Sequence, residues 1–257
     1  MSSSFGVAVA ALLLACRCAT AHAELQTVCG DGLLHRVLVQ PACARDEIHV
    51  YIEGDGTPWV DGTTVAADPT PRRPVALSLM RLDPAFSIYA GRPCYSGLAA
   101  SEGCSSMLWT SGRYSAAVVS SMRVVVRRLL DMYGAKRLVL IGHSGGGTLA
   151  VLLAPSFDET VAVVTVGGNL DVRAWAQWHR YTPLDASLNP VDFPPLPARI
   201  RQLHLVGGRD GNVPPDMATH AIERLGSIPI VYPRFDHACC WERQWPEVLR
   251  RLRSLLD

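Results

Sequence analysis

Residues 138–147, near the middle of the chain, have the sequence LVLIGHSGGG. The first four are all apolar and predict a short strand that is buried on both faces. The next five form a G-x-S-x-G pattern, which between a strand and a helix is typical of a sharp turn that presents its serine above a sheet. Gly142 and Gly146 fit this turn, since larger side chains would collide across it. We therefore expect Ser144 to be a nucleophile; the alternative is a glycine-rich turn with a solvated serine.

Segments with strand and helix patterns alternate on both sides of this turn. The expected strands span residues 33–40, 48–52, 138–141, 161–166, 202–206 and 228–232. The expected helices span residues 116–133, 145–154 and 245–256, and another follows Pro215. Residues 75–82 predict a weaker strand or a buried segment. The alternation predicts a mostly parallel central sheet with helices on both faces, in one domain over residues 24–257.

Residues 171–198 interrupt this alternation. The segment is rich in prolines and aromatic residues, including Trp175, Trp178, Tyr181 and Phe193. We expect it to be a small insertion between the sixth and seventh strands that could cap the site. Its aromatic side chains suggest a pocket for an apolar acyl or aryl group.

The composition is that of a globular protein with little net charge. Of the 257 residues, 49% are hydrophobic and 18% are charged, and 24 Lys and Arg nearly balance 23 Asp and Glu. A chain this apolar can bury a large core, which excludes wholesale disorder. No long run of like charge is present, so a nucleic-acid partner is not expected.

The first 23 residues predict an export signal. Residues 5–15 form an apolar run that is too short to span a bilayer and is typical of a signal peptide, although no basic residue precedes it. Cleavage after Ala21 or Ala23 would give ordinary secretion, whereas residues 13–16 resemble a lipobox that would place a lipid on Cys16. The alternative is an apolar start on a cytosolic protein. We expect a periplasmic or secreted protein, with membrane contact only through a lipid at Cys16.

Six cysteines follow this signal, and an even number in an exported chain indicates disulfide bonds. Cys94 and Cys104 bracket a short loop rich in glycine and serine, which makes them the best predicted pair. Cys29 with Cys43 would connect two neighbouring early strands. If the protein is cytosolic, the same cysteines are small buried thiols instead.

The last two cysteines, Cys239 and Cys240, are adjacent in the sequence. They could form a bridge with each other, remain reduced or pair elsewhere. A metal site that combines them with His237 is not expected, because their spacing matches no common zinc pattern.

A serine nucleophile needs a base, and the base needs an acid to orient it. Asp210 lies in the turn after the strand at 202–206, and His237 follows the last strand by a few residues. Because the carboxyl ends of parallel strands meet at one edge of a sheet, we expect both side chains to lie near Ser144. The three residues follow one another along the chain as nucleophile, acid and base.

This arrangement resembles the α/β-hydrolase family, over roughly residues 33–256. It is similar in particular to exported bacterial α/β hydrolases that have E-G-D-G, R-P-C, G-x-S-G-G-G and H-x-C-C-W motifs, which occur here from residues 53, 92, 142 and 237. Some members of the family place the acid after the strand that precedes the insertion. Asp171 is therefore an alternative to Asp210.

The resemblance also implies an oxyanion hole made by two backbone N–H groups. One is expected from Gly145, directly after the nucleophile, and the other from the loop after an early strand. That loop is Glu53-Gly54-Asp55-Gly56 here, so Asp55 is the expected second donor and Gly56 the next choice. The alternative is that these four residues form an ordinary turn.

The sequence thus predicts a monomeric serine hydrolase that cleaves a carboxylic ester, or a related acyl bond, through an acyl-enzyme. Small-molecule esters are the first expected substrates, followed by lipid esters, peptides and polyesters. The mechanism requires no metal and no organic cofactor. An acyltransferase would use the same residues, and a binding protein on a hydrolase scaffold is a further alternative.

Overall fold

The computed structural model describes residues 23–42 and 44–257. Most of the predicted signal, including Cys16, and Cys43 of the predicted Cys29–Cys43 bridge lie outside the described residues. Within the described part, no helix combines the length and the apolar character that a membrane crossing needs.

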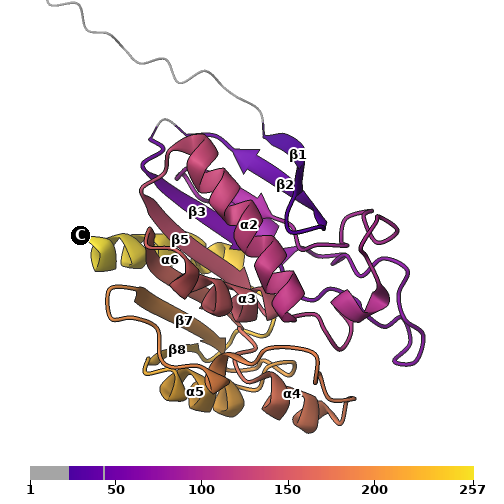
Figure 1. The fold of residues 1–257 in the computed structure, drawn as a ribbon. Coiled ribbons are helices and arrows are strands. Elements are labelled where there is room, and N and C mark those ends of the chain that lie inside the picture. The colour runs from indigo at the N-terminus through magenta and orange to yellow at the C-terminus, as the bar shows by residue number, and fades with distance from the viewer. Residues whose placement is uncertain (1–22, 43) are drawn as a thin grey trace, which may run out of the picture.

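The core of the molecule is an eight-stranded sheet in the order β1-β2-β4-β3-β5-β6-β7-β8 (Figure 1). At one edge, β1 pairs antiparallel with β2, and β2 pairs antiparallel with β4. All other neighbouring strands are parallel, as predicted. The strands are β1 (Glu24–Cys29), β2 (Leu34–Gln40), β3 (Glu47–Ile52), β4 (Ser87–Ala90), β5 (Arg137–His143), β6 (Thr160–Val166), β7 (Arg201–Gly207) and β8 (Pro229–Tyr232).

Helices cover both faces of this sheet. One face packs against α2 (Ala116–Tyr133), α3 (Gly145–Leu153) and α5 (Pro215–Arg224), and the other packs against α1 (Val75–Met80) and α6 (Trp241–Leu256). Figure 1 shows α2 and α3 in front of the sheet and α6 crossing behind it. The side chains of β5 alternate between the two cores: Leu138 and Leu140 face the first helix layer, and Val139 and Ile141 face the second. The all-apolar sequence of this strand follows from burial on both faces.

Helix α2 shows how local sequence sets element boundaries. The Ser115 side chain accepts a hydrogen bond from the Val118 N–H and caps the first turn. Gly134 ends the helix with φ of 64°, a left-handed conformation that glycine adopts without strain. Both ends agree with the predicted range of 116–133.

The structure corrects the strand prediction for residues 75–82. They form a buried segment, but it is helix α1, which begins after Pro74. The carboxylate of Glu53 accepts hydrogen bonds from the N–H groups of Ala76 and Leu77 and so caps the helix from a distant loop. That stabilising contact is not local in sequence, so the pattern of residues 75–82 alone does not reveal it. The short strands β1 and β4 were also not predicted.

The predicted insertion lies between β6 and β7 and contains α4 (Val172–His179) and a short 3-10 helix, η3 (Pro190–Asp192). Asp171 accepts a hydrogen bond from the Ala174 N–H and caps α4. Trp175, His179 and Tyr181 form an aromatic cluster in which the rings of His179 and Tyr181 are stacked with centroids 5.0 Å apart.

Candidate active site

Ser144 occupies the sharp turn between β5 and α3. Its φ of 53° and ψ of −122° are unusual for a residue with a side chain, and such strain persists only where the surroundings enforce it. The two flanking glycines are required sterically: a Cβ at Gly142 would lie 2.1 Å from the Gly146 oxygen, and a Cβ at Gly146 would lie 2.1 Å from the Ile52 oxygen. The Ser144 N–H donates to the Val166 oxygen of β6 at 2.9 Å, which ties the turn to the next strand.

Asp210 and His237 form a hydrogen-bonded pair, with Asp210 Oδ2 2.8 Å from His237 Nδ1. The Asp210 side chain is almost completely buried, and its Oδ1 accepts hydrogen bonds of 2.8 Å from the N–H groups of Asn212 and Val213. Asp210 therefore has a fixed orientation toward the imidazole. The two residues follow β7 and β8, so they lie at the same edge of the sheet as Ser144.

The structure brings the pair and the serine to one cavity. Ser144 and His237 both line a cavity of about 850 Å³. His143, next to the serine, donates a hydrogen bond from Nε2 to the His237 carbonyl oxygen at 2.8 Å. Two glycines leave space around these side chains. A Cβ at Gly54 would lie 3.1 Å from Ser144 Cβ, and a Cβ at Gly167 would lie 3.1 Å from Asp210 Oδ2. Asp171 is not placed with them, because its carboxylate caps α4 and contacts Asn189 and Arg224.

Asn212 is a further residue of the site, and sequence reasoning did not identify it. Its side-chain amide nitrogen lies 2.9 Å from His237 Nε2. Since the amide group donates, Nε2 is the acceptor, and the imidazole proton is on Nδ1 facing Asp210. The backbone carbonyl oxygen of Asn212 accepts hydrogen bonds from Trp175 Nε1 and His179 Nε2, and both of these residues are on α4. Asn212 thus connects the predicted cap to the imidazole. Its position two residues after Asp210, in a tight turn, is the only signal in the sequence.

The loop that contains Asp55 is anchored by charge. The Asp55 carboxylate accepts hydrogen bonds from Arg92, from Arg113 at 2.9 Å and from the Tyr114 hydroxyl. Burial favours the neutral carboxyl, but the charges of Arg113 and Arg92 outweigh it and hold the pKa of Asp55 well below its usual range. The loop is therefore fixed in place by the ionic cluster that its Asp55 side chain forms.

The Asp55 carboxylate also lies close to Gly145, so the two residues predicted to supply oxyanion donors are neighbours in the structure. A Cβ at Gly145 would lie 2.1 Å from Asp55 Oδ1, so a residue larger than glycine at this position would collide with the Asp55 side chain. Neither backbone N–H, of Gly145 or of Asp55, donates a hydrogen bond to another residue of the described chain.

The cavity wall combines polar and apolar groups. The early loops supply Pro58 and Trp59, and the segment after α4 supplies Tyr181, Pro183 and Leu184. Ligand pockets usually have this composition, with a mostly apolar lining and a few fixed polar groups.

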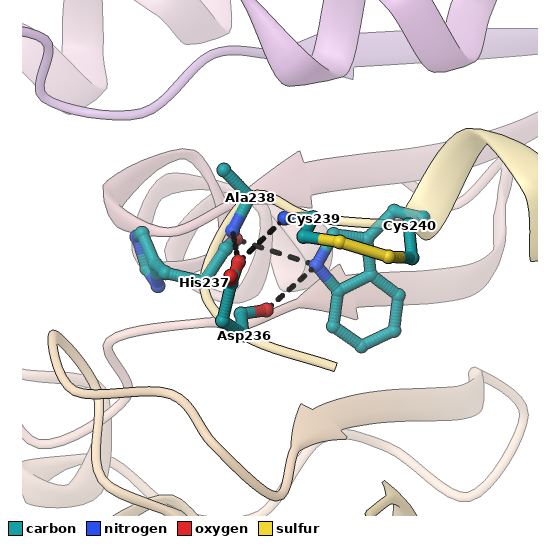
Figure 2. The surroundings of a disulfide bond; sticks show 6 residues. Asp236, His237, Ala238, Cys239 and Cys240 are labelled. Carbon is teal, nitrogen blue, oxygen red and sulfur yellow. Dashed lines mark hydrogen bonds between the residues drawn. A yellow bond between two sulfur atoms is a disulfide. The ribbon is translucent and has the colours of Figure 1, made fainter. Parts of the chain in front are cut away.

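Two disulfide bonds lie in segments that follow Arg92 and His237 in the described chain. Cys94 and Cys104 are bonded, as predicted, and close a loop next to Arg92. Cys239 and Cys240 are bonded to each other, which selects one of the three alternatives left open by the sequence. Figure 2 shows this bridge one residue beyond His237, and Asp236 Oδ1 accepts hydrogen bonds from the N–H groups of Ala238 and Cys239. Asp236 therefore stabilises the loop and does not orient the imidazole.

Similar solved structures share the fold at low sequence identity. An esterase from Pyrococcus furiosus has a TM-score of 0.59 and 13% identity, covering 91% of this chain and 92% of that one. A proline iminopeptidase-related protein from Thermus thermophilus has a TM-score of 0.64 and 13% identity, covering 92% and 99%. A serine hydrolase without lid from Xanthomonas campestris has a TM-score of 0.56 and 13% identity, covering 89% and 95%.

No family model matches the sequence, and no curated protein matches it. At these identities the structural likeness shows architecture alone. Together with the mostly parallel eight-stranded sheet and the helices on both of its faces, it shows that this chain has the α/β-hydrolase fold.

Proposed function

We propose that this protein is a serine hydrolase that cleaves carboxylic esters through an acyl-enzyme. One observation carries the proposal: a strained serine turn opens onto the same cavity as a histidine whose other nitrogen is bonded to a buried aspartate. A hydroxyl becomes an effective nucleophile when a base accepts its proton and an acid orients that base. The names of similar structures, among them an esterase and a serine hydrolase, add support.

In the first half of the reaction, Ser144 Oγ attacks the ester carbonyl carbon while His237 Nε2 accepts the hydroxyl proton. The carbon–oxygen bond to the leaving alcohol then breaks, and the imidazolium returns this proton to the alcohol. Asp210 holds Nδ1–H and stabilises the positive charge on the ring. For Nε2 to reach Ser144, the hydrogen bond from Asn212 must be given up.

In the second half, water attacks the acyl-enzyme carbonyl, and His237 accepts a proton from it. The bond to Ser144 Oγ breaks, the proton passes to that oxygen, and the carboxylic acid leaves. The N–H groups of Gly145 and Asp55 would hold the oxyanion in both halves. Loss of one such donor typically costs about a hundred- to a thousand-fold in rate.

Active-site labelling tests the proposal directly. The purified protein is treated with a fluorophosphonate probe, and its hydrolysis of a series of p-nitrophenyl esters is measured beside that of Ser144→Ala. We expect the probe on Ser144 alone and no turnover above background in the variant. An unlabelled protein, or a variant as active as the parent, would refute it. Product analysis with an added alcohol distinguishes hydrolysis from acyl transfer.

We also propose that the protein functions outside the cytosol. The Cys94–Cys104 and Cys239–Cys240 bonds support this, because disulfides persist in oxidising compartments. Fractionation of cells and the intact mass of the mature chain test it. Cleavage near residue 23, or a lipid on Cys16, agrees with export, and a full-length cytosolic chain does not.

A further inference from the structure

Among the described residues, two carboxylates line the cavity, and each is held by fixed hydrogen-bond partners. Asp55 is bound by the guanidinium groups of Arg92 and Arg113. Glu53 accepts hydrogen bonds from three backbone N–H groups and is buried. Neither carboxylate is free to bind a cationic group of a substrate.

Two arginines on the same wall have no such partner. Arg72 and Arg73 line the cavity with Ser144 and are exposed. Among the described residues, neither guanidinium forms a salt bridge, although Arg92 and Arg113 of the same region both do. The cavity lining therefore has three arginines, with Arg113 as the third, against two carboxylates. Guanidinium groups bind carboxylates and phosphates through paired hydrogen bonds.

The backbone segment that carries the two arginines is anchored at both ends to the loop that contains Asp55. They lie between Pro71 and Pro74, which restrict the backbone on either side. On one side, Pro71 packs against the loop that contains Asp55, because a Cβ at Gly56 would lie 2.8 Å from the Pro71 nitrogen. On the other side, α1 begins at Val75 and is bonded to Glu53 of that same loop. Arg72 and Arg73 therefore bridge two anchor points on one loop.

We infer that the substrate is an ester that carries a negative charge, and that Arg72 and Arg73 bind the anionic group while Ser144 attacks the ester carbonyl. The inference rests on the proposed function and narrows its substrate class. The apolar wall formed by Trp59 and Leu184 would contact the uncharged part of such a molecule.

The test compares esters that differ in charge and little else. One pair is mono-p-nitrophenyl adipate and p-nitrophenyl hexanoate, in which the charge is on the acyl side. The other pair is 4-acetoxybenzoate and its methyl ester, in which the charge is on the alcohol side. We expect kcat/KM to favour the anionic member of at least one pair. In the double variant Arg72→Gln/Arg73→Gln, we expect this preference to fall about tenfold, mainly through KM.

The control variant is Arg81→Gln, which removes an exposed arginine at the end of α1 that does not line the cavity. Its preference should match that of the parent, and added salt should reduce the parent's preference. If neither pair shows an anionic preference, or if both members of the pair that shows it lose activity equally in the double variant, the inference is wrong. Labelling of Ser144 by the fluorophosphonate separates the two proposals: a labelled enzyme without anionic preference refutes this inference alone, and an unlabelled one refutes the proposed function.

Discussion

The described part of the chain contains two histidine–aspartate pairs, at opposite ends of the parallel strands. In one, His237 Nδ1 lies 2.8 Å from Asp210, and in the other His49 Nδ1 lies 2.6 Å from Asp83. His237 follows β8 at the edge where the parallel strands end, whereas His49 is near the start of β3. In both pairs, therefore, Nδ1 of the histidine is hydrogen-bonded to an aspartate carboxylate.

The second nitrogen of each ring distinguishes them. His49 Nε2 lies 3.1 Å from the Glu47 carboxylate, so both of its nitrogens face acids. Burial of His49 disfavours the charged ring, but its hydrogen bonds and charge interactions with Asp83 and Glu47 outweigh this and raise the pKa of His49 to about 9. At neutral pH His49 is a cation with no lone pair to offer. The second nitrogen of His237 meets a neutral amide at the wall of an open cavity. A histidine–aspartate pair can act as a base only when that nitrogen is free to accept a proton.

The largest expected effect is on catalysis. Replacing His237 by Ala should reduce kcat for p-nitrophenyl esters by at least about 10⁴-fold, because it removes the proposed acceptor of the serine proton. His49→Gln, assayed on the folded fraction, should stay within a few-fold of the parent. Comparable losses in the two variants would remove the functional distinction between the pairs. Circular dichroism and size-exclusion chromatography confirm that each variant is folded.

The next effect is on stability, where the order is reversed. Asp83→Asn leaves the His49 cation buried without its closest acid, and it replaces the carboxylate that accepts from the Tyr51 hydroxyl by a neutral amide. Breaking a buried ion pair on one side typically costs about 3–5 kcal/mol in the free energy of unfolding. Urea denaturation measures this loss. Asp210→Asn, at the more open pair, should cost less stability while abolishing most activity. Equal stability losses would show that the His237–Asp210 pair stabilises the fold as much as the His49–Asp83 pair does.

The pH dependence of unfolding provides a third comparison. The folded pKa of His49, about 9, lies above its unfolded value of about 6.5, so the folded protein holds this proton more tightly. The resulting stabilisation is fully present below about pH 6.5 and is lost as the pH rises through 9. We expect the parent to lose on the order of 3 kcal/mol more than His49→Gln between pH 6.5 and pH 9.5 in urea unfolding at each pH. Parallel pH profiles would show that His49 is neutral in the folded state.

The smallest expected effect concerns Asn212. The Asn212 side-chain amide donates a hydrogen bond to His237 Nε2, and the Ser144 hydroxyl must compete with it for the same lone pair. Asn212→Ala should therefore accelerate fluorophosphonate labelling of Ser144 by a few-fold, since a neutral hydrogen bond is worth about 1 kcal/mol. Slower labelling would mean that the amide positions the imidazole and does not block it.

Features that arise from adjacent residues could be predicted from the sequence. The strand, serine turn and helix around residues 138–154 are continuous in the chain, and the α2 boundaries are set by Ser115 and Gly134 beside it. Features that depend on distant contacts could not. Helix α1 needs the Glu53 carboxylate as its cap, and nothing in the sequence associates Asp83 with His49, which lies 34 residues away.

The candidate site shows the same division. The strand-end positions of Asp210 and His237 follow from alternation of strands and helices, so their meeting was predictable. The contact of Asn212 with His237 and the packing of Pro71 on Gly56 depend on how loops fold over the sheet. No periodic pattern encodes such packing, so the arginine pair at the cavity mouth became visible only in three dimensions.

The bond between Cys239 and Cys240 has a practical consequence for biochemical work on this protein. It lies between His237 and the first turn of α6, so a thiol reductant that opens it changes the segment next to the imidazole. Protein made in a reducing cytoplasm, or stored with dithiothreitol, is then chemically different from protein that matured under oxidising conditions. Specific activities from the two preparations are comparable only after the free thiols in each have been counted.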